Sequence, residues 1–289
     1  MAVVYVPYPI VVVFARGLAG SALAQRLFFA RHIRSIKDVY EDGCGIPLGA
    51  AAIQRLLMAK TLILLLRFKI PKFSDRQLAR YVRIDGLDRV RQINGSGQCL
   101  VLASAHYVGA SWTSAVLARL GFDFRAIRRS RGKLHPSYSQ VPYIFVGGDN
   151  AISGLREISG ILKAGGTIFV PLDGLQGRGT VARQFFGRTC HFRRALIELA
   201  WTEGAAIAPV SVRFDLDGSI AIEVHEPFPV VSSEIPMKAA AADIIGCYAE
   251  FLEATIRAYP WCFDPARLDL FWRRTGGDDA VVENVASTS

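Results

Sequence analysis

A histidine, His106, stands between an apolar strand-like run and an apolar helix-like run in residues 99–122, CLVLASAHYVGASWTSAVLARLGF. The first run has the length and composition of a buried strand, and the second those of a helix that ends at Gly121. An imidazole held at such a strand end can act as a general base, taking a proton from a hydroxyl as its oxygen attacks a carbonyl carbon. The competing interpretation is a core histidine whose ring is satisfied by internal hydrogen bonds.

A second candidate, Asp173, closes another apolar run, TIFVPLD. In sheets built from strands that alternate with helices, ligands bind beyond the carboxyl ends of the strands. His106 and Asp173 both fall at such ends, so we expect both to open on the same crevice. There the carboxylate can orient the ring and stabilise the imidazolium that forms. The alternative for Asp173 is a structural role at the end of its strand, capping the loop that follows.

The alternation that positions these residues begins at about residue 75, after Ser74, a candidate helix N-cap. Downstream we expect strands at 98–105, 122–128, 167–173, 206–214 and 220–228, and helices at 107–122, 152–166, 191–205 and 239–260. This order predicts an α/β domain over residues 75–275, with a mixed, largely parallel sheet and helices on both faces. N-terminal amphipathic helices precede it, and the polar residues 276–289 are expected to form a flexible tail.

Residues 1–74 are the most hydrophobic part of the chain. Residues 45–73 predict a helix of about twenty residues that carries Arg55, Lys60 and Arg67. Charges at these positions are costly at the centre of a bilayer, whereas a helix in the interface can place them among lipid head groups. Residues 24–40 repeat the mix of aromatic, aliphatic and basic side chains. We therefore expect a membrane-docking region, with a buried helix pair as the alternative; both can hold at once.

The composition favours an anionic membrane surface as a partner. The formal net charge is +9 and 51% of the residues are hydrophobic, which suits work at an anionic lipid surface. A soluble arginine-rich protein is the alternative. Nucleic acid is not expected, because the arginines are scattered and no nucleic-acid-binding motif is present. The cysteines, whose spacing fits neither a disulfide framework nor a zinc site, indicate a reducing cytoplasm; they are Cys44, Cys99, Cys190, Cys247 and Cys262.

Segments in the same order along the chain resemble the bacterial lipid A late acyltransferase family, within the lysophospholipid acyltransferase superfamily. VLASAHYVGASW is similar to the first family motif, in which a strand delivers a histidine. Residues 162–214 resemble the second block: a glycine-closed helix, a strand ending in aspartate, Phe-Phe-Gly and a helix leading into an Ala-Pro strand. YPWCFDPARLDLFWRR resembles the closing segment. The resemblance covers roughly residues 75 to 275.

The resemblance implies transfer of a fatty acyl group from an acyl carrier protein or coenzyme A thioester. The acceptor would be a hydroxyl, or an amine, of a lipid or glycolipid, and the protein would be bound to the cytoplasmic side of the inner membrane. His106 would be the general base, without a covalent acyl-enzyme. No metal and no further cofactor are expected.

The chain departs from the family pattern at one position. Family members have Asp or Glu after the histidine and four further residues, and here that residue is Ser111. A serine hydroxyl can accept the ring N–H but brings no charge. Either Asp173 supplies the charge, or the chain is a catalytically inactive, acyltransferase-like accessory protein that binds lipid or acyl carrier protein. Asp173 itself is followed by Gly174, where the family has glutamine.

Four arginines are candidate substrate-binding residues. Family members carry arginines that hold substrate phosphates in the region of RRSRGK, which supplies Arg128, Arg129 and Arg131. Arginine suits bidentate phosphate contacts. The glycine-rich DGLQGRGT, with Arg178, can hold a phosphate through backbone N–H groups. A solvated basic loop is the alternative for the first group.

Overall fold

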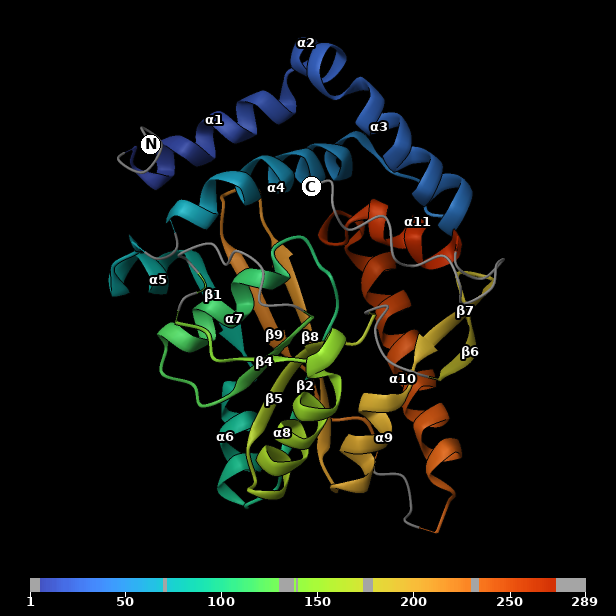
Figure 1. Cartoon of the computed structure of the whole chain (residues 1–289). Helices are drawn as coiled ribbons and strands as arrows, with labels where there is room; N and C mark the ends of the chain where they lie inside the picture. Colours follow the sequence, from blue (N-terminus) through green and yellow to red (C-terminus); the bar gives the residue numbers. More distant parts are fainter. Residues whose placement is uncertain are drawn as a thin grey trace.

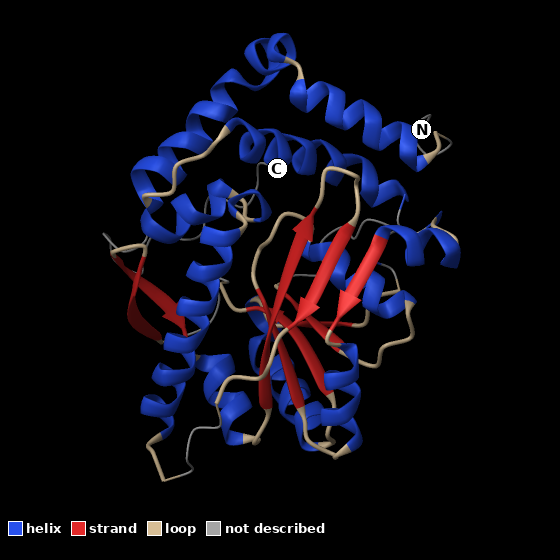
Figure 2. Ribbon diagram, turned by 180° about the vertical axis from the view of Figure 1, so that it is seen from behind, coloured by secondary structure: helices blue, strands red, loops and turns tan. Residues whose placement is uncertain are grey.

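The computed structural model describes residues 6–69, 72–129, 138, 140–173, 179–229 and 234–273. Over these ranges the chain forms an α/β fold, with a mixed and mostly parallel seven-stranded sheet, a separate two-stranded hairpin and surrounding helices (Figures 1 and 2). The expected α/β class, with a mixed and largely parallel sheet, is therefore confirmed.

The seven strands lie in the order β1-β9-β8-β2-β5-β3-β4. Their bounds are β1 (Val82–Asp85), β2 (Leu100–Ser104), β3 (Arg125–Arg128), β4 (Tyr143–Phe145), β5 (Thr167–Pro171), β8 (Ala206–Phe214) and β9 (Ile220–Val224). Neighbouring strands are parallel except β8 and β9, which are antiparallel. All five residues of the central strand β2 are buried, which explains why its sequence is a continuous apolar run rather than an alternating one.

Parallel pairing of β2 with β5 brings the two candidate residues to one edge of the sheet. Leu100 lies opposite Thr167, and Ser104 lies opposite Pro171. The Leu172 backbone N–H donates to the Ser104 carbonyl at 2.9 Å, which extends the pairing beyond the strand ends. The chain therefore leaves both strands side by side.

Helices flank the sheet, and α7 and α8 lie in front of it in Figure 1. The helices after residue 74 are α5 (Asp75–Tyr81), α6 (Leu87–Gly95), α7 (Ala110–Arg119), η6 (Gly148–Asn150), α8 (Ala151–Lys163), α9 (Ala195–Thr202), α10 (Met237–Ala258), η7 (Pro260–Cys262) and α11 (Pro265–Arg273). Ser74 caps α5, as predicted: its hydroxyl accepts the Gln77 backbone N–H, and the Gln77 side chain accepts the Ser74 N–H in return.

The structure corrects the expected helix over residues 191–205. Its first residues belong to a hairpin, β6 (Thr180–Phe185) and β7 (Arg188–Arg193), and α9 begins only at Ala195. The turn places Phe186 at φ 51° and Gly187 at φ 71°, and two left-handed residues match the twist of a two-residue hairpin. Phe192 then points into the core. Strands β1 and β4, both short, were also not predicted.

The N-terminal helices form a layer above one end of the sheet (Figure 1). They are α1 (Tyr8–Gly20), α2 (Ala22–Ala24), η2 (Gln25–Phe29), α3 (Ala30–Lys37), η3 (Asp38–Gly43) and α4 (Ala50–Lys69). Helix α4 buries Ile53, Leu56, Leu57 and Leu62 in the same hydrophobic core as the sheet. The interpretation of this segment as a buried helix is therefore correct for α4. Helix α4 lies between α1 and the sheet.

No single described helix is long and apolar enough to cross a bilayer. Two consecutive segments, Tyr8–Gly20 and Ala22–Gly43, are long and apolar enough to cross a bilayer only when they are taken as one. The chain bends by 68° between them.

Candidate active site

His106 and Asp173 meet at the carboxyl ends of β2 and β5. The carboxylate accepts two hydrogen bonds from the histidine: Oδ1 from the ring Nδ1–H at 2.8 Å and Oδ2 from the backbone N–H at 2.9 Å. One carboxylate thus fixes both the ring and the main chain that carries it. The expectation that the two strand ends open at the same place is confirmed.

Burial divides the pair into a protected acid and an accessible base. The Asp173 side chain is 4% exposed, whereas the His106 side chain is 32% exposed. Because Nδ1 donates its proton to the carboxylate, Nε2 of the neutral ring carries the free lone pair. Nε2 makes no hydrogen bond to a described residue. The ring can therefore accept a proton from a bound group, and the buried carboxylate stabilises the resulting cation.

The residues after His106 are held by a segment from the far end of the chain. Tyr107 forms an isolated antiparallel bridge with Phe263, and their rings meet edge to face at 5.8 Å. The Val108 backbone N–H donates to the Cys262 carbonyl at 2.8 Å. These contacts hold the main chain that directly follows His106.

Gly109 makes the turn from this segment into α7. Its φ is +92°, which favours glycine, and a Cβ there would lie 2.5 Å from the Phe214 ring. The glycine of the motif is therefore required by the close approach of β8.

Two buried tyrosines lie around the acid, and the sequence did not predict them. Tyr248 of α10 donates its hydroxyl proton to the Ser104 carbonyl at 2.8 Å. The Tyr107 hydroxyl lies near Thr255 but makes no hydrogen bond of normal geometry. Burial raises the pKa of both phenols, and the charge of Asp173 adds to this effect. Both phenols are therefore neutral at physiological pH. The sequence did not predict Tyr248 because no spacing pattern connects α10 to β2.

Ser111 lies in the first turn of α7, and its side chain is outside the described part of the structure. Asp173 accepts the Nδ1–H of His106, so this hydrogen bond is already made by a residue other than the serine.

The predicted substrate-binding arginines divide into two groups. Arg131 and Arg178 lie outside the described residues. Arg128 ends β3, and its guanidinium lies over the Tyr143 ring, 5.8 Å from the centroid. Arg129 follows it and is exposed. Their roles in substrate binding stay predictions.

The position of Arg128 in the sheet places it at the same edge as the acid. Strand β3 pairs in parallel with β5, with Arg125 opposite Ile168 and Ala126 opposite Phe169. Continued by two residues, this register sets Arg128 level with Pro171, two residues before Asp173.

A small pocket with a cavity volume of about 10 Å³ lies beside the acid, lined by Asp173, Phe185, Leu252, Phe263, Arg267 and Leu268. Pockets for drug-sized ligands usually exceed roughly 300 Å³. The described residues therefore leave space for about one water molecule beside Asp173, but not for an extended fatty acyl chain.

Nucleophilic thiol chemistry does not fit the cysteines around the site. Burial raises the pKa of Cys262, Cys44 and Cys190 to about 12, so that their reactive thiolate forms are scarce at neutral pH. Within the described ranges, no group of three or more His, Cys, Asp or Glu side chains could hold a metal ion.

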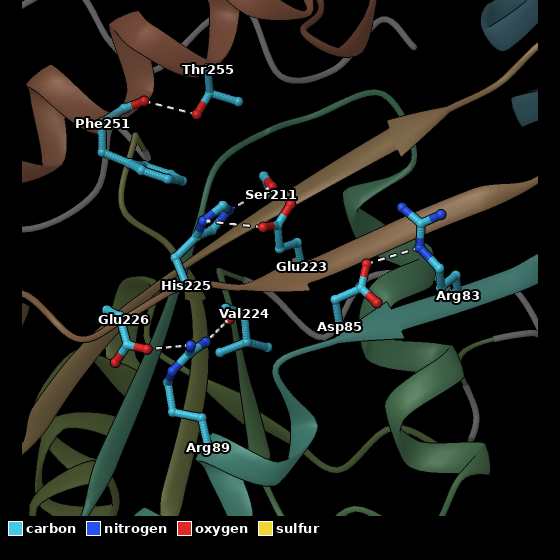
Figure 3. A network of polar contacts seen from close by, with 10 residues as sticks. All are labelled: Arg83, Asp85, Arg89, Ser211, Glu223, Val224, His225, Glu226, Phe251 and Thr255. Carbon is cyan, nitrogen blue, oxygen red and sulfur yellow. Dashed lines mark hydrogen bonds and ion pairs between the residues drawn. The ribbon is translucent and has the colours of Figure 1, made fainter.

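A second histidine–carboxylate cluster lies across β8 and β9 (Figure 3). His225 Nε2 is 2.8 Å from Ser211 Oγ, and Nδ1 is 3.7 Å from Glu223 Oε1. The residue types are those of a Ser-His-acid nucleophile. However, Ser211 is 4% exposed, and the carboxylate is beyond hydrogen-bond distance of the ring. The hydroxyl is closed to substrate, so His106 and Asp173 form the better candidate site.

Comparison with protein-family models and with curated proteins gives no match to this chain.

Proposed function

We propose that this protein is an acyltransferase that moves an acyl group from a thioester donor to a hydroxyl, or an amine, of a lipid or glycolipid acceptor. The observation that carries the proposal is the contact of a buried carboxylate with both N–H groups of a half-exposed histidine, at the carboxyl edge of a mostly parallel sheet. Ligands bind at such edges in α/β proteins.

The chemistry follows from the free lone pair on His106 Nε2. An alcohol is a weak nucleophile, so the ring removes its proton while the oxygen attacks the thioester carbonyl. Asp173 stabilises the imidazolium through the Nδ1–H. The tetrahedral intermediate then expels the donor thiolate, which takes the proton back from Nε2. The acyl group moves directly from sulfur to oxygen, and His106 returns to its starting state.

Asp173 replaces the acid that the motif lacks at Ser111. In the family pattern that acid follows the histidine along the chain, whereas here it comes from the neighbouring strand. The carboxylate reaches His106 through the register of the sheet and not through spacing along the chain, because β2 and β5 end opposite each other.

The proposed partners are an anionic donor, either an acyl carrier protein or coenzyme A thioester, and a membrane lipid acceptor. The net charge of +9 suits either donor and an anionic membrane surface. The proposed location is the cytoplasmic side of the inner membrane.

The size of the pocket favours a second candidate, a catalytically inactive accessory protein that keeps the acyltransferase-like arrangement and binds lipid or acyl carrier protein. The space beside Asp173 is too small for an extended acyl chain.

Transfer from a labelled acyl donor into total membrane lipid distinguishes the two candidates. The acyl carrier protein and coenzyme A donors are assayed separately, with the wild-type protein, His106→Ala and Ser211→Ala. Incorporation that is lost in His106→Ala and kept in Ser211→Ala supports the acyltransferase, because the second network is then not the catalytic site. Background incorporation in all three proteins, with folding and donor loading verified, supports the accessory protein.

A further inference from the structure

The outer surface of the N-terminal layer exposes six large apolar side chains that are 57–74% accessible. They are Ile10, Val13, Phe14, Leu23, Leu27 and Phe28, and we call them the N-terminal patch. Single exposed apolar residues are ordinary, but a group of this size on neighbouring elements marks an interaction surface.

Helix α1 is apolar on two opposite faces. Its inner face, which includes Val11, Val12 and Ala15, is buried, and the helix packs on α4. Its outer face carries Ile10, Val13 and Phe14 at the spacing of a single helical stripe. Packing on α4 requires only the first of these stripes. The second is left facing solvent.

The charges around the patch are all positive. Residues 8–37 contain no Asp or Glu, and the exposed cations among them are Arg16, Arg26, Arg31, Arg34 and Lys37. Apolar side chains interleaved with arginines match the two layers of an anionic bilayer surface, the acyl chains and the head-group phosphates.

The way in which α1 is attached to the rest of the protein favours an orientation in the plane of the membrane interface. The Tyr8 hydroxyl at the start of α1 donates to the Gly218 carbonyl at 2.6 Å. The inner face of α1 is occupied along its length, so lipid cannot surround the helix. Among the described helices, the one pair of segments with the length and composition to span a bilayer is bent by 68°.

We propose that the N-terminal patch docks the protein on an anionic lipid bilayer, with α1 and η2 lying in the plane of the interface and Phe14, Leu27 and Phe28 inserted among the acyl chains. This inference does not rest on acyl transfer, since lipid binding is measured without a donor or an acceptor.

Docking by this surface turns the carboxyl edge of the sheet toward the bilayer. Arg55 and Leu62 of α4 line one small pocket together with Phe214 and Leu216, at the carboxyl end of β8. Strand β8 is parallel to β2, so this is the edge that carries His106. The same layer of helices therefore faces the bilayer on one side and the candidate site on the other.

Flotation of the purified full-length protein with vesicles tests the proposal. The vesicles are pure phosphatidylcholine or phosphatidylcholine with 30% phosphatidylglycerol, at low and high salt. The test variant is Phe14→Ser with Phe28→Ser. The matched control is Leu120→Ser with Ile152→Ser, two exposed apolar residues on the α7–α8 side of the sheet.

We expect wild-type protein and control to float with phosphatidylglycerol vesicles, more weakly at high salt. The test variant should bind at least tenfold more weakly, because burying one large apolar side chain favours the bound state by roughly that factor. Equal binding of the test variant and the wild type would overturn the proposal. A wild-type protein that is dimeric and does not bind vesicles, together with a monomeric test variant, would also overturn it. That result would identify the patch as an interface between two copies. Wild-type protein that resists alkaline extraction from vesicles would identify a spanning segment instead.

Discussion

The carboxylate of Asp173 accepts both the ring Nδ1–H and the backbone N–H of His106, at 2.8 Å and 2.9 Å. The two residues are far apart in the sequence, and each lies two residues after the end of one of two adjacent strands, β2 and β5. The bidentate contact holds the ring in one tautomer and leaves Nε2 without a hydrogen bond to any described residue, which is the arrangement that general-base catalysis requires.

Asp173→Asn tests the charge of this pair with little change in shape. An amide can still contact the histidine, but it cannot stabilise an imidazolium and can select the other tautomer. We expect the acyl-transfer rate to fall by about 10⁴, as for the corresponding change in a Ser-His-Asp triad. The measurement is single-turnover transfer from a labelled thioester. A loss below tenfold would show that Asp173 is structural.

Ser111→Ala tests whether the residue at the family's acid position still contributes. Because Asp173 occupies the Nδ1–H of His106, we expect the acyl-transfer rate to stay within about threefold of wild type, less than the loss of a hydrogen bond needed for catalysis. The same single-turnover assay measures it. A hundredfold loss would mean that the serine acts on the ring or on the substrate directly.

Leu56→Ala tests the burial of α4 in the absence of any membrane. Leu56 is fully buried, so its truncation should lower the free energy of unfolding by about 2–5 kcal/mol. Phe14→Ser on the outer face of α1 should change it by less than about 0.5 kcal/mol. Urea denaturation of both variants measures the difference. Equal stability of the two variants would contradict the position of α4 between α1 and the sheet.

Tyr248→Phe tests the brace between α10 and the end of β2. The substitution removes one of the two hydrogen bonds that the Ser104 carbonyl accepts and leaves the one from the Leu172 backbone N–H. The expected loss of unfolding free energy is about 0.5–1.5 kcal/mol, the net contribution of one hydrogen bond. Tyr259→Phe is the control, since no hydrogen bond of its hydroxyl is seen among the described residues. An unchanged urea midpoint for Tyr248→Phe would show that the brace is not needed.

His225 predicts a pH dependence of stability. Burial lowers the pKa of its ring in the folded state, and the nearby Arg89 and Arg213 act in the same direction, while Glu223 opposes them. A folded-state pKa below the unfolded value of about 6.5 means that the unfolded chain binds the proton more readily. This contribution to stability is complete above about pH 6.5 and is lost as the pH falls through the folded-state pKa.

Urea midpoints of wild type and His225→Gln at pH 7.5 and pH 5.5 check this dependence. His225→Gln should lose less stability than wild type between the two values. Identical pH slopes would assign the acid sensitivity to other groups, such as His32, whose pKa burial also lowers.

Much of the fold was predictable because the local patterns are strong. Strand β2 is a continuous apolar run, as a strand buried on both faces must be, and Ser74 and Gln77 form a capping box that begins α5. The hairpin was missed because each of its strands is short and has few buried residues, such as Phe185 and Phe192. A two-residue turn at Phe186 and Gly187 separates the two strands. That turn and the pairing of the strands are not visible in a helical or strand period.

The sequence by itself determined that His106 and Asp173 each end an apolar strand, and that an apolar, basic region precedes them. Only the tertiary structure decided that β2 and β5 are neighbours in a register that joins the two side chains at 2.8 Å. It also decided that α4 is buried while α1 keeps an apolar stripe exposed. The physical reason is that local patterns record which side chains avoid water. Which partner removes each of them from water depends on contacts between segments far apart in the chain.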